Sequence, residues 1–282
     1  MKRSHLNILT ISFLALSLCV VLPACQAFLP SSPKISDCQN NEAGVPTNCN
    51  IGEFITFGHY EQDGNSNNGK EPINWRILDK NDKGQFLVIS EKVLEPKPYN
   101  ATRIEVTWET STIRSWLNGY GGSYNTVGND YASDNFIDTA FTDEEKAKII
   151  PYNITAHSDS SLPTPSDNDN ATMDKIFLLS IEEAKKYFAD EDDRSADATD
   201  YAIKNNIIRV TACEAMGYCH WPKYKKRTFW WLRSQDRSSK TFAAIVSNLG
   251  DISDAIVDYN AEIEPTKPER YDGVRPAMWV QL

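Results

Sequence analysis

Apolar and polar residues alternate in two regions that bracket the chain after Asn50. In each region the apolar segments have strand length and are separated by polar turns, a pattern typical of antiparallel β-structure. The first region contains segments 51–57, 73–78 and 86–89. The second contains segments 228–234, 241–247, 252–259 and 273–282. Both ends of this part of the chain are therefore predicted to form sheets.

Between these regions the spacing of apolar residues becomes helical. The apolar residues of 113–117 fall at i, i+3 and i+4, and a glycine follows as a natural helix stop. Two further helices are predicted by capping boxes at 142–145 and 180–183. The polar stretches 120–138 and 157–174 are predicted to be surface loops.

Strands at both ends with helices in the middle of the chain predict one α+β domain over residues 51–282. Its sheets are expected to be antiparallel, because polar turns rather than helices join successive strands. The last strand is expected to pair near the first and so to close the domain. Pro276 cannot donate to a ladder, so we expect it at a strand start or a sheet edge.

Residues 1–24 have the features of a signal peptide and are excluded from fold prediction. Two basic residues precede an apolar segment, 6–22, and the sequence Leu-Pro-Ala-Cys follows at 22–25. This ending resembles a bacterial lipobox, which implies cleavage before Cys25 and lipidation of its thiol. Residues 25–50 would then be a lipidated tether. The alternative is an ordinary secretory signal in which Cys25 is incidental.

The net charge of the chain argues against some classes of binding partner. Removal of residues 1–24 takes away two basic residues and no acidic one, which changes the formal charge from −10 to −12. Such a balance argues against nucleic acid and against anionic lipid surfaces as partners. We therefore expect contact with a membrane through the lipid anchor alone, in a bacterial cell envelope and facing the periplasm or the exterior. Carbohydrate and envelope proteins are the partners considered.

Four cysteines remain after the signal peptide and Cys25 are set aside. An even number in an oxidising compartment predicts two disulfides, with three possible pairings. Cys38–Cys49 and Cys213–Cys219 are favoured because each closes a short loop. A metal or redox site is the weaker alternative, since the sequence contains no Cys-x-x-Cys.

Two adjacent tryptophans and two arginines are the candidate binding residues. Trp230 and Trp231 could stack on sugar faces, but strand alternation directs them to opposite faces, and burial in the core is favoured. Arg233 and Arg275 lie among apolar residues and could clamp an anion. A buried ion pair is preferred, because a buried guanidinium needs a partner. Glu109 and Asp79 are the partners considered.

No catalytic motif is evident, and no cofactor is predicted. The Asp- and Asn-rich stretches 63–69, 159–174 and 190–200 contain oxygen ligands of the kind calcium prefers, but none has the spacing of an EF-hand. Solvated loops are the preferred interpretation, with calcium as the one cofactor considered. The histidines of the mature chain lie in no nucleophile or metal motif.

Six sequence blocks, in this order, resemble the bacterial domain of unknown function numbered 6273, over nearly all of residues 51–282. They are residues 52–60, 69–78, 107–118, 174–180, 229–234 and 273–279. The Trp-rich strand and the closing Gly-Val-Arg-Pro are also similar, more distantly, to C-type-lectin-like and sulfatase-modifying (formylglycine-generating) domains. That second resemblance implies helices packed on a central antiparallel sheet.

The two resemblances lead to two functional hypotheses. The first is an envelope lipoprotein with a non-catalytic binding domain, with carbohydrate or another surface polymer as the ligand. The second is an enzyme related to the formylglycine-generating proteins, which use a closely spaced cysteine pair late in the chain. Here Cys213 and Cys219 precede the Trp-rich strand rather than follow it, which disfavours the enzyme.

Overall fold

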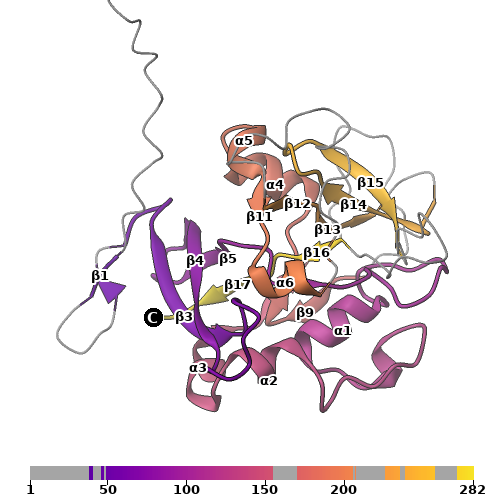
Figure 1. Cartoon of the computed structure of the whole chain (residues 1–282), viewed down its shortest axis with the longest axis horizontal. Coiled ribbons are helices and arrows are strands. Elements are labelled where there is room, and N and C mark those ends of the chain that lie inside the picture. Colours follow the sequence, from indigo (N-terminus) through magenta and orange to yellow (C-terminus); the bar gives the residue numbers. More distant parts are fainter. Residues whose placement is uncertain are drawn as a thin grey trace, which may run out of the picture. The chain divides into compact units, whose positions relative to one another are not determined.

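A computed structural model describes residues 38–40, 46–47, 49–154, 170–205, 207, 226–235, 239–257 and 272–282 (Figure 1). The chain divides into two units, 1–34 and 35–282, and all the described residues belong to the second. This second unit combines helices with mainly antiparallel sheets, which confirms the predicted α+β class. None of the helices in the described ranges combines the length and hydropathy needed to cross a bilayer.

The larger sheet has six strands, all joined by antiparallel pairs. Its order is β10-β17-β5-β4-β3, and β7 also pairs with β17. The strands are β3 (Phe54–Tyr60), β4 (Glu71–Lys80), β5 (Phe86–Ser90), β7 (Ile149–Ile150), β10 (Ile176–Phe177) and β17 (Ala277–Val280). The predicted strand segments 73–78 and 86–89 pair with each other as β4 and β5.

The second sheet has five strands in the order β15-β14-β13-β16-β6. The strands are β6 (Glu95–Pro96), β13 (Trp230–Gln235), β14 (Phe242–Val246), β15 (Ile252–Ile256) and β16 (Gly273–Val274). Only the β13–β16 pair is parallel. The Trp-rich segment therefore lies at the centre of this sheet, as its apolar neighbours predict.

Three two-stranded ladders complete the strands of the described residues. They are β1–β2 (Gln39–Asn40 and Pro46–Thr47), β8–β9 (Tyr152–Ile154 and Thr172–Asp174) and β11–β12 (Ala196–Asp197 and Arg227–Thr228). A disulfide between Cys38 and Cys49, with Cα atoms 4.9 Å apart, brackets the first ladder. This local pairing is confirmed.

The helices are short. They are α1 (Thr112–Asn118), η1 (Gly122–Tyr124), α2 (Phe136–Ala140), α3 (Asp143–Lys148), α4 (Ile181–Tyr187), α5 (Glu191–Arg194) and α6 (Asp200–Lys204). Both predicted capping boxes are present, at the starts of α3 and α4. Gly119 ends α1 with a left-handed φ of 72°, as expected for a C-terminal glycine.

The C-terminal segment differs from its prediction. Residues 273–282 were expected to form one strand, but β16 belongs to the second sheet and β17 to the larger one. The break falls at Arg275 and Pro276, where the proline lacks an N–H and its carbonyl accepts from Ser90 N (3.0 Å). Pro276 thus precedes a strand, as predicted. However, β17 pairs with β5, β7 and β10 rather than with β3.

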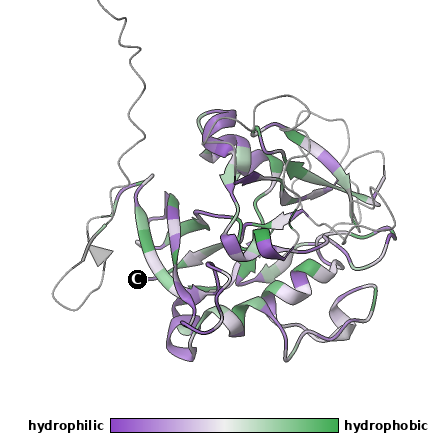
Figure 2. Cartoon of the chain, viewed as in Figure 1, coloured by the Kyte–Doolittle hydropathy of each residue, from purple (hydrophilic) through white to green (hydrophobic). Residues whose placement is uncertain are grey.

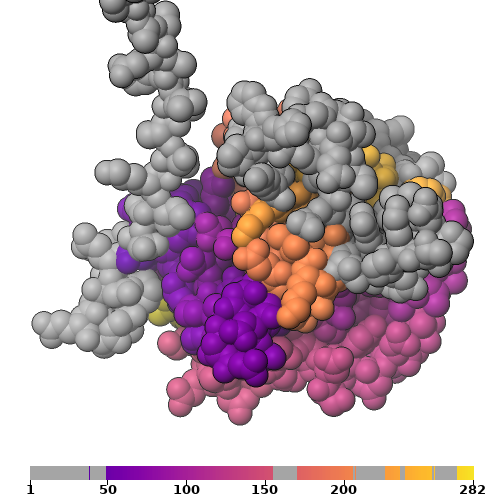
Figure 3. Space-filling view, viewed as in Figure 1, coloured from indigo at the N-terminus to yellow at the C-terminus, as the bar shows by residue number. Residues whose placement is uncertain are grey.

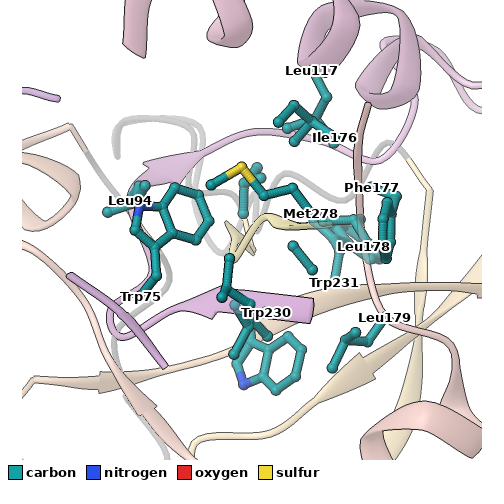
Figure 4. Packing of buried hydrophobic residues seen from close by; sticks show 14 of the residues in the cluster. Trp75, Leu94, Leu117, Ile176, Phe177, Leu178, Leu179, Trp230, Trp231 and Met278 are labelled. Carbon is teal, nitrogen blue, oxygen red and sulfur yellow. The ribbon is translucent and has the colours of Figure 1, made fainter. Parts of the chain in front are cut away.

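The core contains residues from both sheets. Trp75, Trp230 and Trp231 are completely buried, and Figure 4 shows them near Met278 and the apolar run Ile176–Leu179. Figure 2 shows hydrophobic residues along the strands and hydrophilic ones on α3 and α5. The polar faces of these short helices therefore lie in solvent, while the strands supply most of the buried surface.

Candidate functional site

Trp230 and Trp231 both lie in the core. Trp231 meets Tyr99 edge-on, with ring centroids 5.6 Å apart, and donates its indole N–H to Lys97 O (2.8 Å). Trp230 packs against Phe188 on the other face of β13. The predicted burial is confirmed, because both faces of this strand are covered. The hypothesis that these two rings stack on a ligand remains a prediction, and their burial does not support it.

Arg233 is buried and forms the ion pair expected of it. Its guanidinium pairs with Glu183 of α4, with Nη2 3.0 Å from Oε1, and Nη1 donates to Leu178 O (2.8 Å). The prediction that its partner is Glu109 or Asp79 is wrong. The actual partner is brought in by α4, whose position relative to β13 no local pattern in the sequence specifies.

Arg275 is also buried, but its partners are neutral. Its Nε donates to Ser90 O (2.9 Å), and the guanidinium carbon lies 5.0 Å from the Trp230 ring centre and 5.2 Å from that of Phe188. Burial lowers the pKa of this guanidinium to about 9. Arg275 is therefore held by the main-chain carbonyls of Ser90 and Arg194 and by two aromatic faces, rather than by the carboxylate we expected.

The structure describes only some of the remaining predicted site residues. Cys38 and Cys49 form the disulfide described above. The lipidation candidate Cys25 and the second cysteine pair, Cys213 and Cys219, lie outside the described residues.

Three carboxylates meet at the loop between β3 and β4. Oxygen atoms of Glu61, Asp63 and Glu71 lie within 4.8 Å of one another. Glu61 accepts from the backbone N–H of Gly64 (2.8 Å), and Glu71 accepts from that of Gln62 (2.6 Å). These carboxylates thus replace the missing main-chain partners of a tight loop. Sequence reasoning found Asp63 but missed the other two, which lie outside the Asn-rich stretch.

An exposed aromatic surface lies on the loop after α1. The rings of Tyr120 and Tyr124 stack with centroids 4.9 Å apart and planes inclined by 30°. Tyr124 is 55% exposed, and the Tyr120 hydroxyl lies 3.3 Å from the main-chain oxygen of Met173 in β9, a residue that is 57% exposed. We call these three residues the tyrosine surface. Figure 3 shows the magenta and pink part of the chain, which includes this loop, along the lower side of the view.

Polar contacts within the loop hold the tyrosine surface in place. The buried Asn125 side chain donates to Asn129 O (2.8 Å) and accepts from Gly128 N (2.9 Å). A Cβ on Gly122 would lie 2.4 Å from Gly128 O, so only glycine permits this close approach of the backbone. The tyrosines are therefore presented by a preorganised loop.

A buried carboxylate holds Tyr120 of the tyrosine surface in place. Asp174 of β9 is fully buried and accepts from Arg114 Nε (2.9 Å), Trp108 Nε1 (2.9 Å), Thr172 Oγ1 (2.6 Å) and the Tyr120 hydroxyl (3.1 Å). Burial and the Asp174 charge raise the pKa of Tyr120 well above its ordinary value. The phenol therefore stays neutral and keeps donating to Asp174.

Polar side chains lie in the segments next to the tyrosine surface. Asn170 donates to Glu109 Oε2 (3.0 Å), and the Thr126 hydroxyl donates to Thr110 O (3.2 Å). The sequence predicts residues 120–138 to be a polar surface loop, but it gives no sign that two tyrosines stack beside Met173. Only the fold brings β9 next to this loop.

The comparisons with known proteins identify a family. A search of curated proteins and a search of solved structures each found no match. The likeness to C-type-lectin-like domains therefore stays a prediction. A family model described as "Domain of unknown function (DUF6273)" matches residues 83–282, so the match begins later than the resemblance from residue 51. Because the matched range is more than half of the chain, the protein belongs to the DUF6273 family.

Proposed function

We propose that this chain is an envelope lipoprotein whose domain binds carbohydrate, or a chemically similar surface polymer, without catalysis. The tyrosine surface is the proposed binding site. The observation that carries the proposal is the exposed ring of Tyr124, which stacks on the half-buried Tyr120 on a preorganised loop. Aromatic rings suit the apolar faces of sugars, and the Tyr124 hydroxyl supplies a polar group at the edge of its ring.

The surrounding residues support binding rather than turnover. The nearest buried carboxylate, Asp174, already accepts hydrogen bonds from four side chains, so no lone pair is poised to take a proton from a ligand. A ligand would meet the Tyr124 ring, with the Thr126 hydroxyl, the Asn170 amide and the Glu109 carboxylate in the neighbouring segments. The loop contacts that fix Tyr124 before binding reduce the ordering cost of association.

Binding to glycans tests this proposal directly. The purified mature chain should bind insoluble cell-wall glycan in a pull-down and soluble fragments of it in calorimetry. We expect Tyr124→Ala to weaken binding about tenfold, which corresponds to about 1.4 kcal/mol for the lost aromatic contact. The thermal midpoint should change little, because the ring is more than half exposed.

Ile51→Ala is the matched control, because Ile51 is also an exposed apolar residue, 67% exposed, but lies in the first strand region. This variant should bind as the wild type does. Equal glycan binding by Tyr124→Ala and the wild type would reject the tyrosine surface. A reactive thiol pair at Cys213 and Cys219, detected by mass spectrometry with and without reduction, would favour the enzymatic alternative instead.

A further inference from the structure

The sequence contains two Asn-Gly bonds, Asn68–Gly69 and Asn118–Gly119. At such bonds the glycine nitrogen can attack the asparagine side-chain carbon, because glycine has no Cβ to hinder the approach. The new carbon–nitrogen bond forms as ammonia leaves, which gives a cyclic succinimide. Water then opens the ring to aspartate or isoaspartate. The reaction needs a free glycine N–H and an asparagine side chain that can turn.

Asn68–Gly69 meets both requirements. The bond lies in the exposed loop between β3 and β4, and a Cβ built on Gly69 would have no atom within 4 Å. Among the described residues, the Gly69 N–H donates no hydrogen bond. The Asn68 side chain is held by a single contact, in which Nδ2 donates to Asp63 Oδ2 (2.7 Å). Both reacting groups are therefore accessible and lightly restrained.

Asn118–Gly119 meets neither requirement. It lies at the end of α1, where the Gly119 N–H donates to Ser115 O. The Asn118 amide donates to Ile176 O (2.8 Å) and accepts from the backbone N–H groups of Ile176 (3.0 Å) and Lys175 (3.1 Å). Turning this amide to meet the glycine nitrogen would break all of these hydrogen bonds. The fold thus protects one Asn-Gly bond and exposes the other.

We propose that Asn68 is a site of spontaneous deamidation in the folded protein and that Asn118 is not. The product carries a new carboxylate in place of the amide that donates to Asp63. Two carboxylates then face each other beside Glu61 and Glu71. The like charges repel, and Asp63 loses the hydrogen bond that contributes most to its lowered pKa. Deamidation therefore loosens this loop.

Peptide mass spectrometry of aged protein tests the site. The folded mature chain is incubated at mildly alkaline pH and digested, and the gain in mass from replacing an amide by an acid is followed at both asparagines. We expect the modification to accumulate at Asn68 while Asn118 stays intact. In denaturant both bonds should react at similar rates, because the fold no longer protects Asn118. Equal rates at the two sites in the folded protein would overturn the proposal, as would an intact Asn68.

Amide hydrogen exchange tests whether deamidation loosens the loop. Asn68→Asp mimics the product and should speed amide exchange in residues 61–68 severalfold relative to the wild type. Asn67→Asp is the matched control, since it adds the same charge to the same loop at an exposed neighbour. Asn68→Gln keeps an amide and should neither age nor exchange faster. Equal exchange in Asn68→Asp and Asn67→Asp would contradict the loss of the Asp63 contact as the cause.

Discussion

At the scale of single residues, Asp272 is a carboxyl group that the fold buries. Its side chain is 2% exposed, and its Oδ2 has no hydrogen-bond partner among the residues that the structure describes. Burial raises the pKa of Asp272 to about 7. The group holds its proton in the folded protein at a pH where the unfolded chain has released it. Folding is therefore most favourable when this carboxyl is neutral.

Asp272 should make stability depend on pH. Its contribution is fully present below about pH 4, the ordinary aspartate value, and is lost as the pH rises through about 7. Each pKa difference of one corresponds to about 1.4 kcal/mol, so we expect a loss of a few kcal/mol over this range. Urea unfolding at a series of pH values should show that Asp272→Asn removes most of this decline.

Asp251→Asn is the control for this series, because Asp251 is an exposed carboxylate in the turn between β14 and β15. That variant should keep the pH dependence of the wild type. If Asp272→Asn also keeps the pH dependence of the wild type, the decline in stability arises from other groups. The partly buried Glu95 is the next candidate, since burial also raises its pKa.

At the scale of elements, one side chain of α4 has two roles, and one of these roles joins the helix to β13. Glu183 accepts from the backbone N–H of Ser180 (2.8 Å) to complete the capping box, and it also pairs with Arg233. The capping box could be predicted from the local sequence. The ion pair could not, because it depends on the packing of a helix against a strand about fifty residues away in the chain.

Glu183→Ala should therefore destabilise the fold by about 3 kcal/mol, since removing one member of a buried pair leaves the other charge uncompensated. Loss of the helix cap adds to this cost. Lys185→Ala is the control, an exposed residue of the same helix, and should cost much less. Urea unfolding measures both. A similar small effect in the two variants would show that Arg233 finds another partner.

The helix α2 was not predicted, and the composition of its local sequence explains why. The helix α2 is capped by Asn135, whose side chain accepts from Asp138 N (2.8 Å), but this cap lies within a stretch rich in glycine, asparagine and aspartate. Its apolar residues Phe136 and Ile137 are buried against the rest of the core. Tertiary burial rather than propensity thus forms this helix, which is why the stretch 120–138 was predicted to be entirely loop.

At the scale of the whole molecule, the arrangement of the strands depends on long-range pairing. The strand β17 lies between β5 and β10 in the larger sheet, so the last strand of the chain joins two segments far from it in sequence. Alternation predicts that such a segment is a strand, but not which strands it meets. The tyrosine surface has the same origin, since Tyr120 and Met173 are brought together only when β9 packs beside α1.

The location of the molecule is expected to depend on Cys25. If this cysteine is lipidated, the wild-type protein should fractionate with membranes and be released by detergent, because each acyl methylene group buried contributes about 0.8 kcal/mol. Cys25→Ser should remove the lipid and shift the protein from the membrane fraction. Cys19→Ser is the matched control within the signal peptide and should leave fractionation unchanged. Mass spectrometry of the mature N-terminal peptide decides the outcome: a lipidated Cys25 supports the lipoprotein, and an unmodified peptide that contains Cys25 establishes an ordinary secretory signal.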